Sequence, residues 1–551
     1  MPTDFRVSGP GRRASLAVLA LLSGLFVAVQ PASPAQAAVC DVPVVNPVAC
    51  ENSKPGTSPS VWDISGSGDA SIQGFATDIS ANVGGAVRFK VATPATSYRL
   101  DIYRLGYYAG LGARKIVTVA PSATLPQIQP SCLTDGSTGL VDCGNWGVSA
   151  SWTIPAGTVS GVFFAQLVRT DGTSGESHIP FVVRDDSSHS AVDFQTSDTT
   201  WQAYNQYGGN SLYAGSPAGR AYKVSYNRPI TTRGPTEEDY LFHAEFPMIR
   251  FLEANGYDVS YTSGVDTDRN GALIKNHQAF LSVGHDEYWS GQQRANVEAA
   301  RDAGVSLAFL SGNEVFWKTR WEPSTDGSST AYRTLVCYKE THANAKIDPT
   351  PAWTGTWRDP RFSPPADGGR PENGLSGTLF MINGDNTRKD SIKVPAADGK
   401  MRFWRGTAVA KQAAGATATM PAGTLGYEWD SELDNGSRPA GLVRLSSATY
   451  SITNDLLLDY GSTYGSGTAN HALTLYRAPS GALVFGAGTV QWAWGLDATH
   501  DNAGTATNAS MRQATVNLLA DMGVQPATLV SGLSLATRST DTTAPLSLIH
   551  I

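Results

Sequence analysis

The chain has 551 residues, of which 41% are hydrophobic and 16% are charged. Its length allows roughly two to four domains, each with a core of its own. The net charge is −7 and no basic cluster occurs, which argues against nucleic acid as a partner. After the first residues, no segment approaches the roughly 18 to 20 apolar residues that cross a bilayer, so we also expect no membrane partner.

Residues 1–37 have the features of an export signal. Arg12 and Arg13 precede an apolar run over 16–29, and Ala35 and Ala37 frame a cleavage site. We therefore expect a secreted, extracellular protein. The arginine pair leaves open whether export follows the general or the twin-arginine route.

Four of the five cysteines lie in two short-range pairs, Cys40 with Cys50 and Cys132 with Cys143. Such spacing predicts small disulfide loops in an oxidising compartment. Cys337 is left over. It lies in an apolar stretch, which favours a buried thiol over a nucleophile.

Residues 38–186 carry a strand pattern. Apolar and polar residues alternate over 86–91, 98–103 and 162–168, with Gly, Pro and Ser turns between these runs, and 179–183 is predicted to be the last strand. Short strands at this spacing are typical of a β-sandwich, so we predict a sandwich domain over these residues.

After residue 191 the pattern changes to alternating strands and helices. Apolar residues at helical spacing predict a helix over 242–255, and Ser290 with Gln293 forms a capping box for a second helix that ends near Gly304. Strands are predicted at 258–261, 279–283 and 305–310. Strands that alternate with helices indicate βαβ units and a parallel sheet.

The predicted α/β domain covers 191–525 and contains a long irregular insertion at about 321–421, which is rich in Pro, Gly and Trp. Strands at 472–476 and 482–486 and a helix at about 510–522 resume the domain. Residues 526–551 are Ser/Thr-rich and are interpreted as a linker-like tail. The predicted fold class is therefore α/β plus all-β, with the sandwich first.

Polar side chains follow two strands of the predicted parallel sheet. His285 and Glu287 come after the strand at 279–283, and Asn313 follows the strand at 305–310. Because open sheets bind ligands outside the carboxyl ends of their parallel strands, we expect these side chains to meet at a site. The alternative is that they only cap helices and close loops.

The sequence lacks the motifs of several common enzyme classes. It has no G-x-S-x-G elbow, H-E-x-x-H pair, Walker loop or C-x-x-C pair, which removes most serine hydrolases, zincins and nucleotide enzymes. It does contain scattered oxygen donors: Tyr204, Glu287, Tyr288, Glu314 and Glu428. Carboxylates and phenolates prefer hard cations, although tyrosines also fill cores and line sugar sites.

The segment 201–317 resembles the large (β) subunit of N,N-dimethylformamidase and its secreted actinobacterial relatives. The similarity rests on the His-x-Glu-Tyr-Trp element at 285–289 and the Gly-Asn element at 312–313, and it continues through Glu428 and the segment 486–492. The resemblance implies a β-sandwich joined to a flavodoxin-like domain of the class I glutamine amidotransferase type. It also implies hydrolysis of a small amide at a mononuclear iron held by two tyrosines and a glutamate.

The resemblance also implies roles for single residues. Tyr204 and Glu287 match metal ligands, and His285 and Asn313 match pocket residues beside the iron. Glu428 matches the acid that faces the substrate; it would take a proton from water while His285 and Asn313 stabilise the oxyanion. Since His285 occupies the turn where the amidotransferases carry their nucleophilic cysteine, we expect no thiol chemistry.

The second tyrosine ligand has no counterpart at the expected spacing, which falls on Phe163 or Phe164. Phenylalanine has no oxygen with which to bind a metal. Tyr207 or a tyrosine within 103–108 could replace it, or the metal could be absent from this chain.

Two other functions stay open from the residues. Thirteen Trp and twenty Tyr beside a β-sandwich suit a non-catalytic secreted protein that binds glycans or surfaces. Paired carboxylates such as Glu287 and Glu314 would suit a glycan hydrolase. The expected partner is accordingly a small-molecule amide or a glycan, and a homo-oligomer is allowed.

Overall fold

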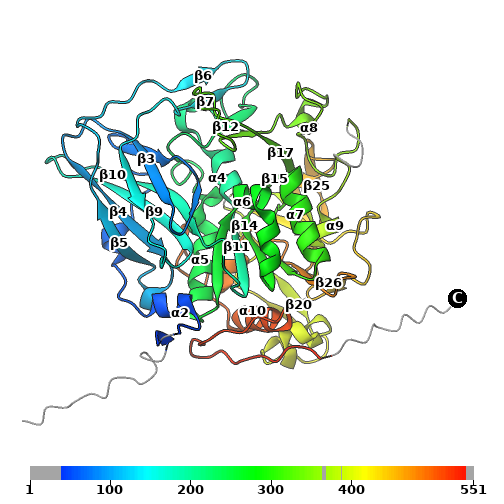
Figure 1. Cartoon of the computed structure of the whole chain (residues 1–551). Helices are drawn as coiled ribbons and strands as arrows, with labels where there is room; N and C mark the ends of the chain where they lie inside the picture. The colour runs from blue at the N-terminus through cyan, green and yellow to red at the C-terminus, as the bar shows by residue number, and fades with distance from the viewer. Residues whose placement is uncertain (1–38, 42, 363–367, 386, 541–551) are drawn as a thin grey trace, which may run out of the picture.

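The computed structural model describes residues 39–41, 43–362, 368–385 and 387–540 (Figure 1). Within these residues the chain is a mixed α/β protein with several sheets and few helices. The export signal predicted at 1–37 lies outside the described residues. The early strands, blue and cyan in Figure 1, stand beside a larger group of green strands and helices.

The early strands form two facing sheets. One sheet contains β1 (Gln73–Ala76), β3 (Ala86–Ala92) and β8 (Ala150–Thr153), and the other contains, in order, β2 (Ser80–Asn82), β10 (Glu176–Arg184), β9 (Gly161–Arg169), β4 (Tyr98–Leu105) and β5 (Ala113–Val119). The four strands predicted in this region are present as β3, β4, β9 and β10. Side chains of both sheets, including Phe89 and Phe181, meet in one apolar core, as in a sandwich.

The strand β9 is buried on both faces. Phe163 points into the core between the two sheets, whereas Val162 and Phe164 pack into a second core together with Phe242 of α5 (Leu241–Ala254). A strand with two buried faces has apolar side chains in succession instead of strict alternation. Through β9 the sandwich is therefore packed directly onto the rest of the molecule.

A seven-stranded sheet forms the centre of the remaining chain. Its order is β13 (Val259–Ser263), β11 (Val192–Thr196), β14 (Ala279–His285), β16 (Ser306–Gly312), β27 (Leu483–Gly486), β26 (Thr474–Arg477) and β23 (Val443–Arg444). The first five strands are parallel and the last two are antiparallel additions. The predicted parallel sheet is thus confirmed, with the unpredicted strand β11 between β13 and β14.

Helices cover both faces of this sheet. α5 and α10 (Ala509–Asp521) share a core with Leu281, and α7 (Gly291–Asp302) shares another core with the adjacent side chain Phe280. Adjacent side chains of a strand point to opposite faces, so α5 and α10 lie on one face and α7 on the other. The capping box of α7, made by Ser290 and Gln293, is confirmed.

The insertion at about 321–421 is more regular than the sequence predicted. It contains β18 (Thr334–Val336), α8 (Glu340–Ala343), α9 (Asn373–Ser376), β19 (Leu379–Asn383) and the antiparallel pair β20 (Lys393–Pro395) and β21 (Thr417–Thr419). β18 joins β12 (Lys223–Ser225), β17 (Trp317–Glu322) and β15 (Tyr288–Ser290), and β19 joins β22 (Glu428–Ser431), β24 (Ala448–Leu457) and β25 (Tyr464–His471). Strands of three to five residues are too short to show a two-residue period.

The remaining elements are short: α2 (Pro47–Asn52), α3 (Pro59–Trp62), β6 (Leu133–Asp135), β7 (Leu140–Asp142), α4 (Asp198–Tyr204) and α6 (Gly264–Arg269). Both predicted disulfides, Cys40–Cys50 and Cys132–Cys143, are present, and Cys337 is a buried free thiol. In the part of the chain that the structure describes, no helix has the length and apolar character to cross a bilayer. The domain boundaries at 186, 191 and 525 stay predictions.

A buried ion pair joins the sandwich to the central sheet. Arg104 of β4 donates from both terminal nitrogens to the carboxylate of Glu253 of α5, at 2.8 and 2.9 Å. Tyr261 of β13 and Asn52 of α2 also donate to this carboxylate, at 2.7 and 2.6 Å. Arg104 and Glu253 are 1% and 2% exposed, so each charge depends on the other for its stabilisation.

We predict that Glu253→Ala lowers the free energy of unfolding by about 3 to 5 kcal/mol, because it leaves the Arg104 guanidinium buried without its anion. Urea unfolding followed by fluorescence measures the loss. Lys54→Ala, which breaks the partly exposed pair between Lys54 and Glu51, is the control and should cost less than about 1 kcal/mol. Equal losses in the two variants would contradict the role given to Arg104 and Glu253.

Candidate active site

A cavity of about 460 Å³ opens at the carboxyl ends of β14 and β16. Its lining includes Tyr204, Tyr213, Glu287, Asn313 and Glu428. These residues come from α4, from the loop after it, from the ends of two central strands and from β22. The position matches the sheet edge at which the sequence predicted a site.

Glycine at position 284 sets the turn that carries His285 and Glu287. Gly284 has a φ of 77°, and a Cβ at this position would lie 2.9 Å from the Cβ of Ala244. Both the backbone conformation and the close contact with α5 therefore favour glycine. Asp286, between the two site residues, points elsewhere and accepts hydrogen bonds from Gln195 and Ser282, at 2.6 and 2.8 Å.

His285 lies among three carboxylates. Its Nδ1 is 2.8 Å from Asp239, and its Nε2 is 2.8 Å from Glu428 and 3.4 Å from Glu287. Burial opposes a charged imidazole, but Glu428, Asp239 and Glu287 outweigh it and raise the pKa of His285 well above its usual value. We therefore assign an imidazolium that donates from both nitrogens. Burial also raises the pKa of Asp239 to about 7, against the opposing effect of His285.

Asn313 and Glu428 are held against each other beside His285. The Asn313 side-chain amide donates to Glu428 Oε2 at 2.8 Å, the same oxygen that His285 approaches. Asn313 has a φ of 48°, in the left-handed region, directly after β16 ends at Gly312. Asparagine tolerates this conformation better than most residues, which is consistent with its place at the turn.

Two tyrosines stack against each other beside Glu287. The rings of Tyr204 and Tyr213 are 4.0 Å apart, and the Tyr213 hydroxyl donates to the two Glu287 oxygens, at 2.7 and 2.8 Å. Tyr288 donates to the Tyr213 hydroxyl at 2.6 Å, and Lys339 Nζ lies 3.2 Å from the centroid of the Tyr213 ring. Burial, followed by the charge of Glu287, raises the pKa of both Tyr204 and Tyr213 well above the usual value, although Tyr213 as a whole residue is 40% exposed.

The residues that spacing suggested for a second tyrosine ligand lie away from the cavity. Phe163 and Phe164 lie on β9, in the cores on its two faces, and neither lines the cavity. The candidates proposed to replace them also lie outside the cavity lining. Tyr103 stacks on Phe164, Tyr107 lies under the Arg250 guanidinium, Tyr108 bonds to Glu51 and Arg104, and Tyr207 packs on Trp146. The tyrosine beside Tyr204 and Glu287 is Tyr213. Its one sequence signal is the Gly208-Gly209 turn after Tyr204, which lets the chain fold back.

Glu314, which could have paired with Glu287 in a glycan hydrolase, lies outside the cavity lining. Its carboxyl group accepts a hydrogen bond from Thr378 at 3.2 Å and one from Ser311 at 3.4 Å, behind Asn313. The two carboxylates therefore do not face a common substrate.

Asp239 and Tyr427 were not predicted from the sequence. Both line the cavity, and the Tyr427 hydroxyl donates to Asp239 at 3.2 Å.

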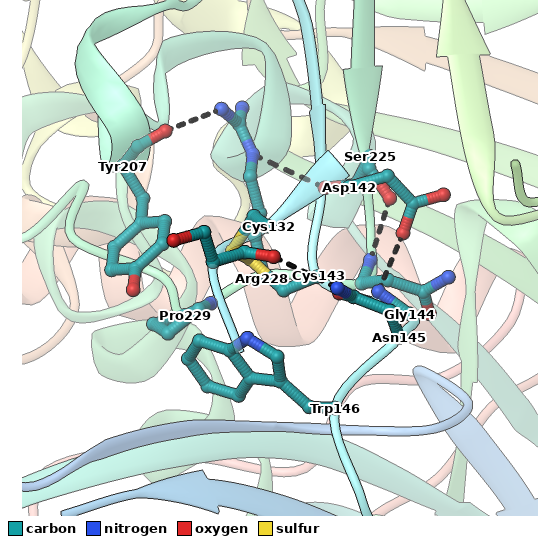
Figure 2. The surroundings of a disulfide bond; sticks show 12 residues. Cys132, Asp142, Cys143, Gly144, Asn145, Trp146, Tyr207, Ser225, Arg228 and Pro229 are labelled. Carbon is teal, nitrogen blue, oxygen red and sulfur yellow. Dashed lines mark hydrogen bonds between the residues drawn. A yellow bond between two sulfur atoms is a disulfide. The ribbon is translucent and has the colours of Figure 1, made fainter. Parts of the chain in front are cut away.

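Arg228 fixes the loop between Tyr204 and Tyr213. Its buried guanidinium donates to the backbone carbonyls of Gln202, Asn205, Tyr207, Asn210 and Ser225, at 2.7 to 3.2 Å. Figure 2 shows Arg228 beside the Cys132–Cys143 disulfide, whose Cys143 N–H donates to the carbonyl of Asn227 at 2.7 Å. Within the same disulfide loop, the carbonyl of Gly139 accepts a hydrogen bond from the Asn210 side chain at 2.8 Å, so the loop contacts the segment that holds the two phenols.

A family model described as N,N-dimethylformamidase beta subunit-like, C-terminal, matches residues 99–505, which include every residue of the site. The chain belongs to this family. The resemblance expected from the motifs at 285–289 and 312–313 is thereby confirmed. The comparison with curated proteins gave no match.

Two solved structures show weak similarity. A cellulose-active polysaccharide monooxygenase from M. thermophila is 17% identical, with 19% of this chain and 51% of that chain covered and a TM-score of 0.11. A cycloisomaltooligosaccharide glucanotransferase from Paenibacillus sp., complexed with cycloisomaltoheptaose, is 9% identical, with 47% and 57% covered and a TM-score of 0.14. The matches span only about half the length of each of these chains. TM-scores this low do not indicate a common fold.

We predict that Arg228→Met destabilises the loop that carries Tyr213, because several buried carbonyls lose their donor at a cost of about 1 kcal/mol or more each. Limited proteolysis should cleave the segment 205–222 faster in this variant, and its melting temperature should fall. Arg220→Met is the matched control in the same loop, since among the described residues Arg220 donates to a single carbonyl, that of Tyr338 at 3.5 Å. Cleavage at the same rate in the two variants would remove Arg228 from this role.

Proposed function

We propose that this chain is a secreted hydrolase that cleaves the C–N bond of a small, non-peptide amide at a single metal ion. The observation that carries the proposal is the convergence of Tyr204, Tyr213, Glu287 and Glu428 on one cavity. His285 lies outside the cavity lining, with its Nε2 2.8 Å from Glu428. Membership of the dimethylformamidase-like family supports it. The two disulfides are consistent with an oxidising compartment and so support secretion.

The proposed architecture of the central domain is that of the class I glutamine amidotransferases. The support is the strand order β13-β11-β14-β16-β27, in which the first strand in sequence lies between the second and the third. At the end of β14 this chain carries His285. Cys337 is buried, and burial raises its pKa to about 12, so the chemistry we propose does not use a thiolate.

The donor set beside the cavity fits a hard cation. Among the described residues, no group of three or more His, Cys, Asp and Glu side chains is arranged to hold a metal, so a metal ion here would need the two phenols as ligands. Tyr204, Tyr213 and Glu287 supply only oxygens, which suit a cation such as ferric iron. Without a cation, burial and Glu287 keep both phenols protonated, and a bound cation would favour the phenolates. When bound, the metal would act as a Lewis acid toward the amide carbonyl.

Glu428 is placed to act as the general base. Its Oε2 is held by Asn313 and His285, while no described residue donates a hydrogen bond to Oε1. Glu428 lines the cavity, so Oε1 is the oxygen that takes a proton from an attacking water. Once Glu428 is protonated, its negative charge no longer holds the donors of His285 and Asn313. These donors then turn to the oxyanion that develops on the substrate.

The cavity leaves room for amides larger than dimethylformamide. Its volume of about 460 Å³ lies within the range of roughly 300 to 1,000 Å³ that is typical of sites for drug-sized ligands. A substrate panel should therefore run from formamide and N,N-dimethylformamide to N-alkyl benzamides. Glycan binding without metal or hydrolysis would instead favour the non-catalytic glycan-binding function.

We predict that Glu287→Ala abolishes both bound metal and hydrolysis, and that Tyr213→Phe retains less than about a tenth of the metal, since loss of even a supporting group costs roughly 10- to 100-fold in affinity. Elemental analysis of the purified protein measures the metal. Tyr207→Phe is the matched control and should keep the wild-type content, because Tyr207 does not line the cavity. A metal content that is unchanged in Glu287→Ala would refute the metal site.

We also predict that Glu428→Gln lowers kcat by a factor on the order of 10² to 10⁴, because the amide cannot accept the proton from water. Metal content should stay at the wild-type level, because Glu428 is not among the proposed ligands. Asp385→Asn removes another carboxylate of the cavity lining, and this control should keep most of the turnover. Steady-state kinetics on the best amide of the panel separates the two variants, and a kcat near wild type in Glu428→Gln would exclude Glu428 as the base.

A further inference from the structure

Two buried carboxyl groups lie directly behind the cavity. Glu314 follows Asn313 in the chain, and Asp430 lies two residues after Glu428 on β22. Each is 1% exposed, and neither takes part in the proposed chemistry. We propose that Asp430 and Glu314 form a proton-sharing pair that positions Asn313, and through Asn313 the base Glu428. This inference rests on the proposed function, which it extends to residues outside the cavity.

Asp430 holds the backbone of Asn313 while Glu428 holds its side chain. The Asn313 N–H donates to Asp430 Oδ1 at 2.9 Å, and the Asn313 side-chain amide donates to Glu428 Oε2 at 2.8 Å. Residues two apart on a strand point to the same side, so β22 presents both carboxylates to Asn313. Asn313 is thus fixed at two points in a left-handed conformation that costs energy outside glycine.

The second oxygen of Asp430 requires a donor. Oδ2 is buried and has no hydrogen bond from a described residue. The side chains within reach of the Asp430 carboxylate are Thr378 and Glu314, and the Thr378 hydroxyl donates to Glu314. The neighbour of Oδ2 is the carboxyl group of Glu314, and two ionised carboxylates in contact repel each other strongly. Burial and the charge of Asp430 raise the pKa of Glu314 well above its usual value, so Glu314 keeps its proton and donates it to Asp430.

Hydrogen bonds from neighbouring hydroxyl groups keep the Glu314 carboxyl group in place. Thr378 and Ser311 donate to its oxygens at 3.2 and 3.4 Å. The nearby acid Glu372 is paired with Arg358. Burial, and after it the charge of Glu372, raises the pKa of Asp430 to about 6, against the opposing effect of the Asn313 N–H. The pair therefore carries one negative charge, located on Asp430, where it meets the Asn313 N–H. A charge-assisted hydrogen bond of this kind is stronger than a neutral one.

The decisive comparison is between variants of Glu314 that keep or remove a donor. Glu314→Gln still has N–H groups for Asp430 and should keep kcat within about threefold of wild type, whereas Glu314→Leu should lower kcat on the order of tenfold to a hundredfold with little change in KM, as a small displacement of catalytic groups does. Equal kcat losses in the two variants would show that Glu314 acts as an anion or only as packing, and would overturn the proposal.

Asp430 is tested in the same way. Asp430→Asn keeps an oxygen for the Asn313 N–H and should recover most of the kcat that Asp430→Ala loses. Asp434→Ala, an exposed acid on the following loop, is the control and should match wild type. If Asp430→Ala does not fold, the two Glu314 variants decide the matter. A kcat within twofold of wild type in Asp430→Ala would remove Asp430 from this role.

A measurement without substrate distinguishes failure of this inference from failure of the proposed function. In protein labelled with ¹⁵N at asparagine, the Asn313 amide proton should resonate downfield because it bonds to a carboxylate, and Asn313→Asp identifies the resonance. Glu314→Leu and Asp430→Ala should shift it, and Asp434→Ala should not. If wild type hydrolyses no amide but the resonance behaves in this way, the pair stands and the proposed reaction fails. An unshifted resonance in both pair variants overturns the pair.

Discussion

The candidate site depends on the compensation of the buried His285 charge by neighbouring acidic side chains. The imidazolium assigned to His285 has only 5% of its surface exposed, and three acidic side chains within hydrogen-bond or ion-pair distance compensate its charge. Those carboxylates come from three separate parts of the chain: Asp239 just before α5, Glu287 after β14 and Glu428 at the start of β22. The folding of each of these segments is therefore coupled to the others through one imidazolium.

The parts of this arrangement that the sequence predicted share a common physical basis. Parallel strands all end at the same edge of a sheet, so His285 and Asn313 could be placed together from the strands that precede them. Likewise, the alternation in β3 and β4 and the capping box of α7 are local patterns with local causes. Glu287 follows the same strand as His285, whereas Tyr204 and Glu428 were assigned to the site through the family motifs, since no periodic pattern marks them.

The residues that the sequence did not reveal are those whose positions depend on loops. Tyr213 lies in the loop after α4 and is brought beside Glu287 by tertiary contacts, so its place could not be predicted from spacing along the chain. Asp239 lies in a short turn without a motif. The described hydrogen bonds of Arg228 go to backbone carbonyls, and since every residue has a carbonyl, the sequence does not reveal these partners. The short strands of the insertion pair with distant segments, and this pairing is a tertiary effect that local propensity does not encode.

The two-sided burial of β9 has a consequence for how this protein can be divided. Its Val162 and Phe164 are as much a part of the core under α5 as Phe163 is of the sandwich core. A recombinant version that starts after β10 would expose the apolar surface around Phe242. It would also leave the carboxylate of Glu253 without its partner Arg104. The sandwich is thus an integral part of the folded protein, and fusion partners or purification tags belong at the chain ends instead of at the junction.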